Sequence, residues 1–547
     1  MTQCNRNRLH FQGHGRREVV AQFDGGMITS DAGGLLLREV NETFGVIRKF
    51  ASCFQDHRDG ELIEHPVEQL LAQRVMGIAL GYEDLNDHDE LRHDPLMALL
   101  CGRDDLTGQK RRRERDRGKA LAGRNTLNRL ELTPVGASAS SRYKKIVACH
   151  VDIFLQMHAK PPEEIVLDID ATDDPLHGRQ LGRFFHGYYK SYCYLPLYIF
   201  CGEFLLCAQL RPSNIDAAAG STGQLDRIVS QIRCVWPDVR IIIRGDSGFC
   251  RDNIMRWCEE HDVDFILGLA KNRRLKRAIS KELHEAKQQF QQTGKATRVF
   301  KDFTYRTRKS WSRERRVIGT AEHLSKGANP RFVVTSLSPE EVDARALYEE
   351  RYCARGNMEN RIKEQQLFLF ADRTSAQTMR ANQMRLWLSS VAYVLFVAVR
   401  EFGLKGTELE NAQCNTIRTK LLKIGARVRV TFRRVWLSFS ESYPWQRLFQ
   451  QVLLNLQRLR PMRLQIESAP ITTRLAEELE RPCEPGPFCA EDGKFDPAGP
   501  IWQFDADKTT TLPHSITTQA DKPSDNQKTE PRQTGCETCG LERKTTL

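Results

Sequence analysis

The sequence predicts an α/β protein in which a mixed β-sheet is covered by helices. Between residues 156 and 270, short apolar β-rich runs alternate with segments whose apolar residues recur at helical spacing. These segments follow the order three strands, helix, strand, helix, strand, which is typical of a layered α/β domain with a mixed sheet. The chain has 547 residues, enough for about three or four folded units.

The composition indicates a folded protein with an anionic partner. Hydrophobic residues make up 40% and charged residues 28%, so a large core can be buried. The net charge is +12, and residues 467–547 hold nine Lys/Arg against fifteen Asp/Glu, so the basic excess lies in the first 466 residues. A basic body attracts a polyanion, and nucleic acid is the commonest one, although a basic composition also occurs without such a partner.

Secreted and membrane classes are disfavoured. The sixteen cysteines are scattered singly through apolar segments, a pattern that fits reduced thiols in a cytoplasmic protein. The first residues contain no apolar stretch typical of a signal peptide. The longest apolar run, residues 386–399, is fourteen residues long, whereas about 20 are needed to span a bilayer. We therefore expect a buried helix there and no membrane partner.

Residues 1–155 are predicted to be a mostly helical DNA-binding region. Ser30 or Asp31 is positioned to cap the first helix. The basic run 110–117 is either a solvated loop or a segment that contacts phosphates. The expected elements are a strand at 19–23 and helices at 35–40, 67–80 and 121–132.

The central elements are predicted from their apolar patterns. A glycine between the second and third strands, Gly202, indicates a hairpin. The expected strands are residues 164–170, 193–201, 203–210, 239–248 and 264–270, and the expected helices are residues 223–236 and 251–262.

The remaining chain divides by composition. Residues 271–330 form a basic insertion with a charged helix and short strands, and residues 331–400 return to the sheet and carry a long helix that starts near Pro339. Residues 401–466 are a basic region with a β pair that turns near Arg433 and Arg434. Residues 467–547 form an acidic low-complexity tail that we expect to be disordered.

Three acids form the candidate catalytic constellation. Strand alternation places Asp168 and Asp170 on one face, and the position at the carboxyl end of the strand favours Asp170. Asp246 ends another strand and lies between two glycines that permit a sharp turn. Glu359 shares a helical stripe with Tyr352, Arg355 and Lys363.

Three carboxylates on separate elements are what a site for two Mg²⁺ ions needs. Hard cations take oxygen ligands, and two such ions about 3.5–4 Å apart stabilise the attacking and leaving oxygens of an in-line displacement. Mn²⁺ is expected to substitute. Glu364, five residues after Glu359, points about 140° away toward Asn357 and Asn360, so we expect it on a solvated face where a Gln substitution costs little.

Several longer motifs carry a family resemblance. The helix reads Tyr352-Cys-Ala-Arg355-Gly-Asn-Met-Glu359, a Tyr-x-x-Arg-x-x-x-Glu pattern. With DIDATDDPLHG (168–178), FFHGYYKSYCYLPLYIF (184–200), RPSNIDAAAG (211–220) and RGDSGFC (244–250), residues 20–465 resemble DDE transposases of bacterial insertion sequences, in particular the insertion-sequence family called thirteen-eighty.

The resemblance implies an RNase H-like catalytic core that cuts the ends of a mobile element and joins them to target DNA. It implies that Asp170, Asp246 and Glu359 bind the metal ions and that Tyr352 and Arg355 contact DNA near the cut. Lys363 is the lysine nearest to position 366, where the broader branch has a Lys and this chain has Gln366. The implied partners are the terminal inverted repeats, target DNA and a second copy of the chain, in a bacterial cytoplasm at the nucleoid.

Two alternative functions stay open from the sequence. One is a two-metal DNA nuclease that cuts without joining strands, and the other is a non-catalytic protein that binds element ends. A separate question concerns the aromatic residues Phe184, Phe185, Tyr188 and Tyr189, for which core packing is expected in preference to stacking on an unpaired base.

Overall fold

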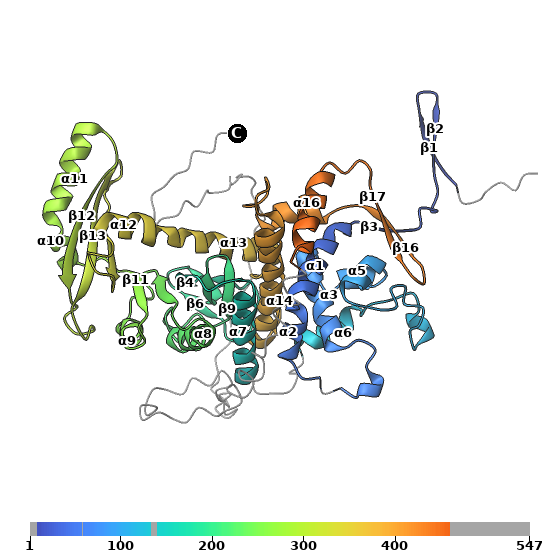
Figure 1. Cartoon of the computed structure of the whole chain (residues 1–547), viewed down its shortest axis with the longest axis horizontal. Coiled ribbons are helices and arrows are strands. Elements are labelled where there is room, and N and C mark those ends of the chain that lie inside the picture. The colour runs from blue at the N-terminus through green and yellow to red at the C-terminus, as the bar shows by residue number, and fades with distance from the viewer. Residues whose placement is uncertain (1–7, 57, 133–138, 460–547) are drawn as a thin grey trace, which may run out of the picture. The chain divides into compact units, whose positions relative to one another are not determined.

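A mixed sheet of nine strands organises the protein in the computed structural model, which describes residues 8–56, 58–132 and 139–459 (Figure 1). The strand order is β12-β13-β15-β11-β10-β4-β8-β9, with β14 paired to β13. β4, β10 and β11 pair in parallel, and every other pairing in this sheet is antiparallel. The strands are β4 (Glu164–Ala171), β8 (Leu197–Cys201), β9 (Phe204–Gln209), β10 (Arg240–Gly245), β11 (Asp264–Gly268), β12 (Thr297–Tyr305), β13 (Arg315–Leu324), β14 (Gly327–Ala328) and β15 (Arg331–Thr335). The expected disordered tail, 467–547, lies outside the described residues.

The predicted α/β order of the central part is confirmed. Three strands are followed by α8 (Ser221–Val235), β10, α9 (Asp252–Glu260) and β11. The hairpin at Gly202 is present, and this glycine has a φ of 56°, which favours a residue without a Cβ. The single strand expected at 193–201 is two strands, because Pro196 lacks the N–H that a continuous ladder would need.

The first of the two strands in place of the expected strand 193–201 belongs to a second, small sheet. It has the order β5-β7-β6, with β5 (Asp174–Pro175), β6 (Phe184–His186) and β7 (Ser191–Tyr194). This sheet directly follows β4 in the chain, and it therefore lies next to the end of the strand that carries Asp170.

Segment 271–330 continues the main sheet. Its two long strands, β12 and β13, pair with each other, and β13 pairs with β15, which in turn pairs with β11. The charged helix expected here is two helices, α10 (Arg273–Ala278) and α11 (Ser280–Thr293). α10 begins after Asn272, whose side-chain oxygen accepts a hydrogen bond from the Leu275 amide at 3.0 Å.

Helices cover both faces of the sheet. α7 (Ala139–Gln156), α8 and α9 pack with the strands in one hydrophobic cluster that includes Leu167, Ile243 and Phe265. On the other face, Ile242 and Ile266 pack against Leu347 of the helical segment that leads to Glu359. The expected side-chain alternation along β4 is observed, since Leu167 and Ile169 enter the first cluster.

The long helix near Glu359 is irregular. It starts at Ala344 rather than near Pro339, because the Asp343 carboxylate accepts hydrogen bonds from the amides of Arg345 and Ala346. It comprises α12 (Ala344–Ala346), the π-helix η4 (Leu347–Tyr352), the 3₁₀-helix η5 (Cys353–Arg355) and α13 (Gly356–Leu369). π-turns inside helices are frequent at functional sites, and this one ends at Tyr352, directly before the 3₁₀ turn that contains Arg355.

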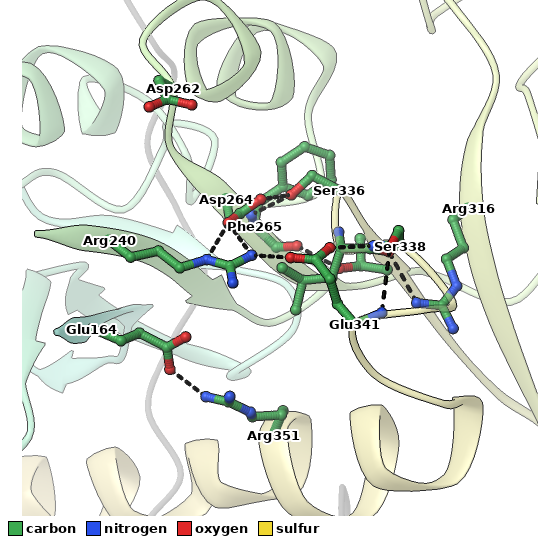
Figure 2. A network of polar contacts seen from close by, with 12 residues as sticks. Glu164, Arg240, Asp262, Asp264, Phe265, Arg316, Ser336, Ser338, Glu341 and Arg351 are labelled. Carbon is green, nitrogen blue, oxygen red and sulfur yellow. Dashed lines mark hydrogen bonds and ion pairs between the residues drawn. The ribbon is translucent and has the colours of Figure 1, made fainter. Parts of the chain in front are cut away.

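A polar network holds this helical segment to the amino ends of the parallel strands (Figure 2). The Arg240 guanidinium lies 2.7 Å from Asp264 and 2.7 Å from Glu341, and Arg351 pairs with Glu164. Because Glu164, Arg240 and Asp264 begin β4, β10 and β11, these contacts link β4 to the helical segment through Arg351, and β10 and β11 to Glu341 in the loop just before it. The acids of the candidate site lie at the opposite edge.

The N-terminal and C-terminal regions share one hydrophobic core. Residues such as Leu71 of α3, Phe396 of α14 and Val452 of α16 belong to the same cluster. Helices predominate in the described part of residues 8–155, and α3 has the predicted bounds. The helices here are η1 (Ala32–Gly34), α1 (Leu35–Phe44), α2 (Val46–Ser52), η2 (Gly60–Leu62), α3 (Val67–Leu80), α4 (Asp87–Leu91), α5 (Pro95–Leu100), η3 (Glu114–Asp116), α6 (Arg124–Leu132), α14 (Met379–Ala398), η6 (Val399–Leu404), α15 (Cys414–Ile417), η7 (Arg418–Leu422) and α16 (Gln446–Gln457).

The apolar helix of this core is buried. Met379–Leu404 is long and apolar enough to cross a membrane by length and composition, but 89% of its most apolar window is covered by other parts of the protein.

The cap expected for the first helix is absent: neither Ser30 nor Asp31 caps it, and Asp31 instead accepts a hydrogen bond from Tyr82 and pairs with Lys423.

Three further strands lie beside this core. β3 (Met27–Thr29) pairs with β16 (Ala426–Val430), and β16 pairs with β17 (Val435–Phe439). The predicted basic β pair is therefore confirmed, with its turn at residues 431–434. β1 (Leu9–His14) and β2 (Arg17–Ala21) form a separate hairpin near the strand expected at 19–23.

A close backbone contact joins the N-terminal and C-terminal regions at Gly33 and Leu421. This contact generates a stability prediction. A Cβ at Gly33 would lie 1.8 Å from the Leu421 carbonyl oxygen. We expect Gly33→Ala to force the backbones apart and to cost at least about 1–3 kcal/mol, measured by denaturant unfolding. Gly60→Ala is the control, because nothing lies within 4 Å of its added methyl group. Equal stability of the two variants would contradict the contact.

Candidate active site

Two of the predicted acids leave the sheet side by side. Asp170 lies at the carboxyl end of β4, and Asp246 directly follows β10. These strands are parallel neighbours, and their register pairs Gly245 with Ile169, so the two carboxylates emerge from adjacent positions. The Asp246 carboxylate also accepts a hydrogen bond of 2.7 Å from the Gly248 amide, which fixes the sharp turn after the strand.

Arg355 joins the third acid to this pair. Its Nη1 lies 3.3 Å from Oδ2 of Asp170, and its Nη2 donates a hydrogen bond of 2.6 Å to Oε1 of Glu359. The Arg355 side chain is almost fully buried, whereas that of Glu359 is 23% exposed. The structure therefore brings Asp170, Asp246, Glu359 and Arg355 into one cluster.

The cluster concentrates negative charge in a place with little solvent. Burial, together with the neighbouring carboxylates of Asp246 and Glu359, raises the pKa of Asp170 to about 7, although Arg355 opposes the shift. Burial alone would lower the pKa of Arg355, but the surrounding carboxylates raise it above its ordinary value. The site therefore needs a cation, and Arg355 supplies one positive charge.

The donor set fits a hard divalent cation in its chemistry. Three carboxylates at the carboxyl edge of a sheet offer the oxygen ligands that Mg²⁺ prefers. Among the residues that the structure describes, no three acidic, His or Cys side chains are yet close enough together to hold a metal ion. The guanidinium of Arg355 lies between Asp170 and Glu359 and pairs with both carboxylates.

Tyr352 and Lys363 lie differently with respect to the acids. A Cβ at Gly268 would lie 2.5 Å from the Tyr352 hydroxyl and 3.0 Å from the Ser247 amide. Gly268 therefore permits Tyr352 to approach the turn that holds Asp246, a role the sequence analysis missed, although a glycine ending a buried strand is a recognisable signal. Lys363 is exposed on α13 and lies outside the carboxylate cluster.

Asp168 has a structural role next to the site. Its carboxylate forms two hydrogen bonds, of 2.6 and 2.8 Å, with the guanidinium of Arg244 on the neighbouring strand. Arg244 also donates to the Arg351 carbonyl, which belongs to the helical segment leading to Glu359. Arg244 was missed by the sequence analysis, because an arginine inside an apolar strand gives no local sign of its partner.

The expectation that Glu364 lies on a solvated face is wrong. Glu364 is buried, pairs with Arg400 at 2.7 Å and accepts a hydrogen bond from the Cys414 amide. The helix presents this side to the apolar core of α14, where Arg400 supplies the compensating charge. Glu364 is therefore a core ion-pair residue and lies away from the cluster of Asp170.

The expectation that the aromatic segment packs in the core is also wrong. Phe184, Phe185 and Tyr188 are 41%, 57% and 78% exposed. They belong to the small sheet that branches off after β4, so they have no helical layer to cover them. Tyr189 is half-buried, and its hydroxyl donates a hydrogen bond of 3.4 Å to the Ala171 carbonyl, one residue beyond Asp170.

Gln366 contacts a second buried acid. Its Nε2 donates a hydrogen bond of 2.8 Å to Oδ1 of Asp174. Asp174 is fully buried, and burial together with Asp372 and Asp173 raises its pKa to about 8, despite the bond from Gln366. The side-chain amide of Gln366 is therefore hydrogen-bonded to Asp174, whose raised pKa favours the protonated form near neutral pH.

The basic run 110–117 folds over the N-terminal region, away from the acids. It lines a cavity of about 380 Å³ together with His65 and Arg129. Part of its charge is neutralised, since Arg111 lies 3.1 Å from Glu64. Burial, together with the nearby Arg111, Arg103 and Arg58, lowers the pKa of His65 to about 3.

Comparisons with known proteins point to one family. The model of the family described as "Transposase DDE domain group 1" matches residues 11–461. Among curated proteins, no match is found. Among solved structures, the chain is similar to the piggyBac transposase in the cryo-EM structure of its synaptic complex with hairpin DNA, at 10% identity and a TM-score of 0.35, covering 86% of this chain and 89% of that chain.

The contrast between Glu359 and Glu364 can be tested by stability. We expect Glu364→Gln to remove one of the two carboxylates that pair with the buried Arg400 and to leave Glu203 as the other, at a cost of about 1–3 kcal/mol in the free energy of unfolding. Glu359→Gln should change stability little, because the side chain is partly exposed and Arg355 keeps Asp170 as a partner. Thermal unfolding measures both, with the exposed Glu350→Gln as control. A stable Glu364→Gln variant would refute the buried pair.

The raised pKa of Asp174 predicts a pH dependence of stability. Between its unfolded pKa of about 4 and its folded pKa of about 8, the folded protein binds the extra proton. Stability should therefore fall as the pH rises through this window, by at most about 1.4 kcal/mol per pH unit from this group. Asp174→Asn should flatten the dependence, measured by urea unfolding from pH 5 to 8. The exposed Asp238→Asn should leave the slope unchanged, and equal slopes for all three proteins would count against a protonated Asp174.

Proposed function

The chain belongs to the family described as Transposase DDE domain group 1, and from this we propose that it cleaves DNA at the ends of an insertion sequence and joins the freed 3′ ends to target DNA. The observation that carries the proposal is the gathering of Asp170, Asp246 and Glu359 at the carboxyl edge of one sheet. The family match covers this whole region. The reaction is phosphoryl transfer, first to water and then to a 3′-hydroxyl.

We further propose an RNase H-like core and membership of the insertion-sequence family called thirteen-eighty. The core proposal is supported by the sheet order β9-β8-β4-β10-β11 and by the helix that brings Glu359 to it. The family proposal is supported by the motifs around Asp170, Asp246 and the Tyr352-to-Glu359 helix. The proposed location is the bacterial cytoplasm, where the described cysteines, all of them free, would stay reduced.

The three carboxylates would hold two Mg²⁺ ions, and Mn²⁺ would substitute. When bound, the ions polarise the scissile phosphate and stabilise the charge that develops on the attacking and leaving oxygens. The raised pKa of Asp170 means that it must lose a proton before it can act as a ligand near neutral pH. The partly exposed Glu359 keeps the cluster open to solvent and to DNA on that side.

Arg355 would change partners during this process. In the structure it neutralises Asp170 and Glu359. The guanidinium would bind a DNA phosphate near the cut, which is the role that the resemblance implies for it. Tyr352, beside the turn of Asp246, would orient the same strand, and the exposed Lys363 would contact the DNA backbone further away.

Asp246→Ala is the variant that tests the assignment. It should abolish cleavage while DNA binding is retained, because Asp246 is a proposed metal ligand and is not a phosphate contact. The substrate is duplex DNA that carries the inverted repeats flanking the gene, and binding is measured by gel shift in Ca²⁺. Asp238→Ala, which removes an exposed acid just before β10, is the matched control. Cleavage by Asp246→Ala at the wild-type rate would overturn the triad.

A second assay separates the transposase from the two alternatives. Wild-type protein is given pre-cut element ends and a supercoiled target plasmid. A transposase joins the ends to the plasmid. A nuclease cuts intact ends but joins nothing, and a non-catalytic binding protein does neither. We propose that the active form is a homodimer or larger assembly on DNA, which cross-linking in the same reaction would reveal.

A further inference from the structure

The ribbon formed by β16 and β17, residues 426–439, extends beyond the sheet that supports it. β3 pairs only with residues 426–428 of β16. From Arg429 to Trp436 the two strands pair with each other alone, and the chain reverses at residues 431–434 (Figure 1). The end of the ribbon therefore offers both of its edges to a partner.

The two faces of the ribbon differ in chemistry. Val428, Val430 and Leu437 point inward and pack against the core that α14 organises. Strand alternation places Arg427, Arg429, Trp436 and Ser438 on the outer face, and all four are exposed. The apolar face explains why the ribbon folds, but it does not explain the arginines on the outer face.

The charge of the ribbon is unbalanced. Residues 426–439 include Arg427, Arg429, Arg433 and Arg434 and contain no Asp or Glu. None of these guanidiniums forms an ion pair with a carboxylate in the described part of the chain. Other exposed arginines are paired, for example Arg240 with Asp264 and Arg251 with Asp216. The ribbon is thus a concentrated positive surface without internal compensation.

The positive groups are also preordered. The indole of Trp436 lies 5.7 Å from the guanidinium carbon of Arg429 and 5.7 Å from that of Arg434. The turn is fixed by Thr431, whose amide and hydroxyl both donate to the Arg434 carbonyl, at 2.9 and 2.8 Å. Phe432 is fully exposed at the tip. Restricting side chains before binding reduces the entropy lost when they contact a ligand.

We propose that this ribbon is a binding site for duplex DNA, with its arginines on the phosphates and its tip in a groove. The major groove is about 12 Å wide and admits a two-stranded ribbon. Arginine binds phosphate through paired N–H donors, and the ribbon offers four arginines that form no ion pair with a described carboxylate to the closely spaced phosphates of a duplex. The site goes beyond the proposed function, because it is separate from the three carboxylates and binds DNA without cutting it.

The salt dependence of binding tests the charge argument. A labelled duplex of random sequence is titrated in EDTA, so that cleavage plays no part. Each phosphate contact contributes about 0.9 to the slope of log K against log salt, so replacing all four arginines with Ala should lower the slope by roughly 3–4. The four-Lys version should retain most of the slope. A matched control, Lys271, Arg273, Lys276 and Arg277 to Ala, removes four exposed charges around α10.

The position of the tip is tested by cross-linking. A photoreactive phenylalanine analogue at Phe432 should cross-link to the duplex, whereas the same analogue at the exposed Val235 of α8 should not. Unchanged slope in the four-Ala variant, or equal slopes in that variant and the α10 control, would overturn the proposal. So would a change in oligomeric state with unchanged DNA binding, which would identify the ribbon as a contact between copies of the chain.

The outcomes also separate this site from the proposed catalytic function. Failure of the triad assignment leaves the ribbon's binding in EDTA intact. Failure of the ribbon leaves cleavage by the wild-type protein and its loss in Asp246→Ala unchanged. Thermal unfolding of the four-Ala variant should match wild type, because the four side chains are exposed and make no ion pair with a described carboxylate.

Discussion

The buried ion pair between Asp168 and Arg244 determines where all three acids of the site lie. The pair joins β4 to β10 two residues before Asp170 and Asp246. It therefore fixes the relative register of the two strands that lead to these residues. Through the Arg351 carbonyl it also reaches the helical segment that carries Glu359. A buried charge pair is a poor source of stability compared with apolar packing, but it penalises every register in which the charges separate. The contribution of the Asp168–Arg244 pair is therefore to position the strand ends that carry the acids.

The same register constraint explains why several carboxylates lie close together in the site. Holding the strand ends in register forces Asp170 and Asp246 together, and the helix adds Glu359. The protein tolerates this arrangement through one buried guanidinium, that of Arg355, and through partial protonation of Asp170. In the structure, Arg355 therefore supplies the positive charge that pairs with Asp170 and Glu359.

The sequence predicts the local part of this structure and misses the long-range part. The strands, the α3 helix, the side-chain parity of Asp168 and Asp170, and the turn at Arg433 follow from apolar spacing and turn residues, which act over a few positions. The pairing of β13 with β15, the partnership of Glu364 with Arg400 and the exposure of Phe185 depend on which segments meet in the fold. The regular helix assumed for Tyr352 to Glu359 fails for a related reason: the π-turn and 3₁₀-turn at residues 347–355 lie where this segment packs on a face of the main sheet.

The shared core of the N-terminal and C-terminal regions has a consequence for synthesis. α3 ends at residue 80, whereas α14, its principal partner, begins at residue 379. At about 5–20 residues per second, roughly 15–60 s of translation separate the two. During that time α2, α5 and α6 can cover part of α3, but the side that packs on α14 has no native partner, so the nascent chain exposes it to chaperones and to other chains. Completion of the core around α3 is thereby coupled to the synthesis of α14, which ends at residue 398 of 547.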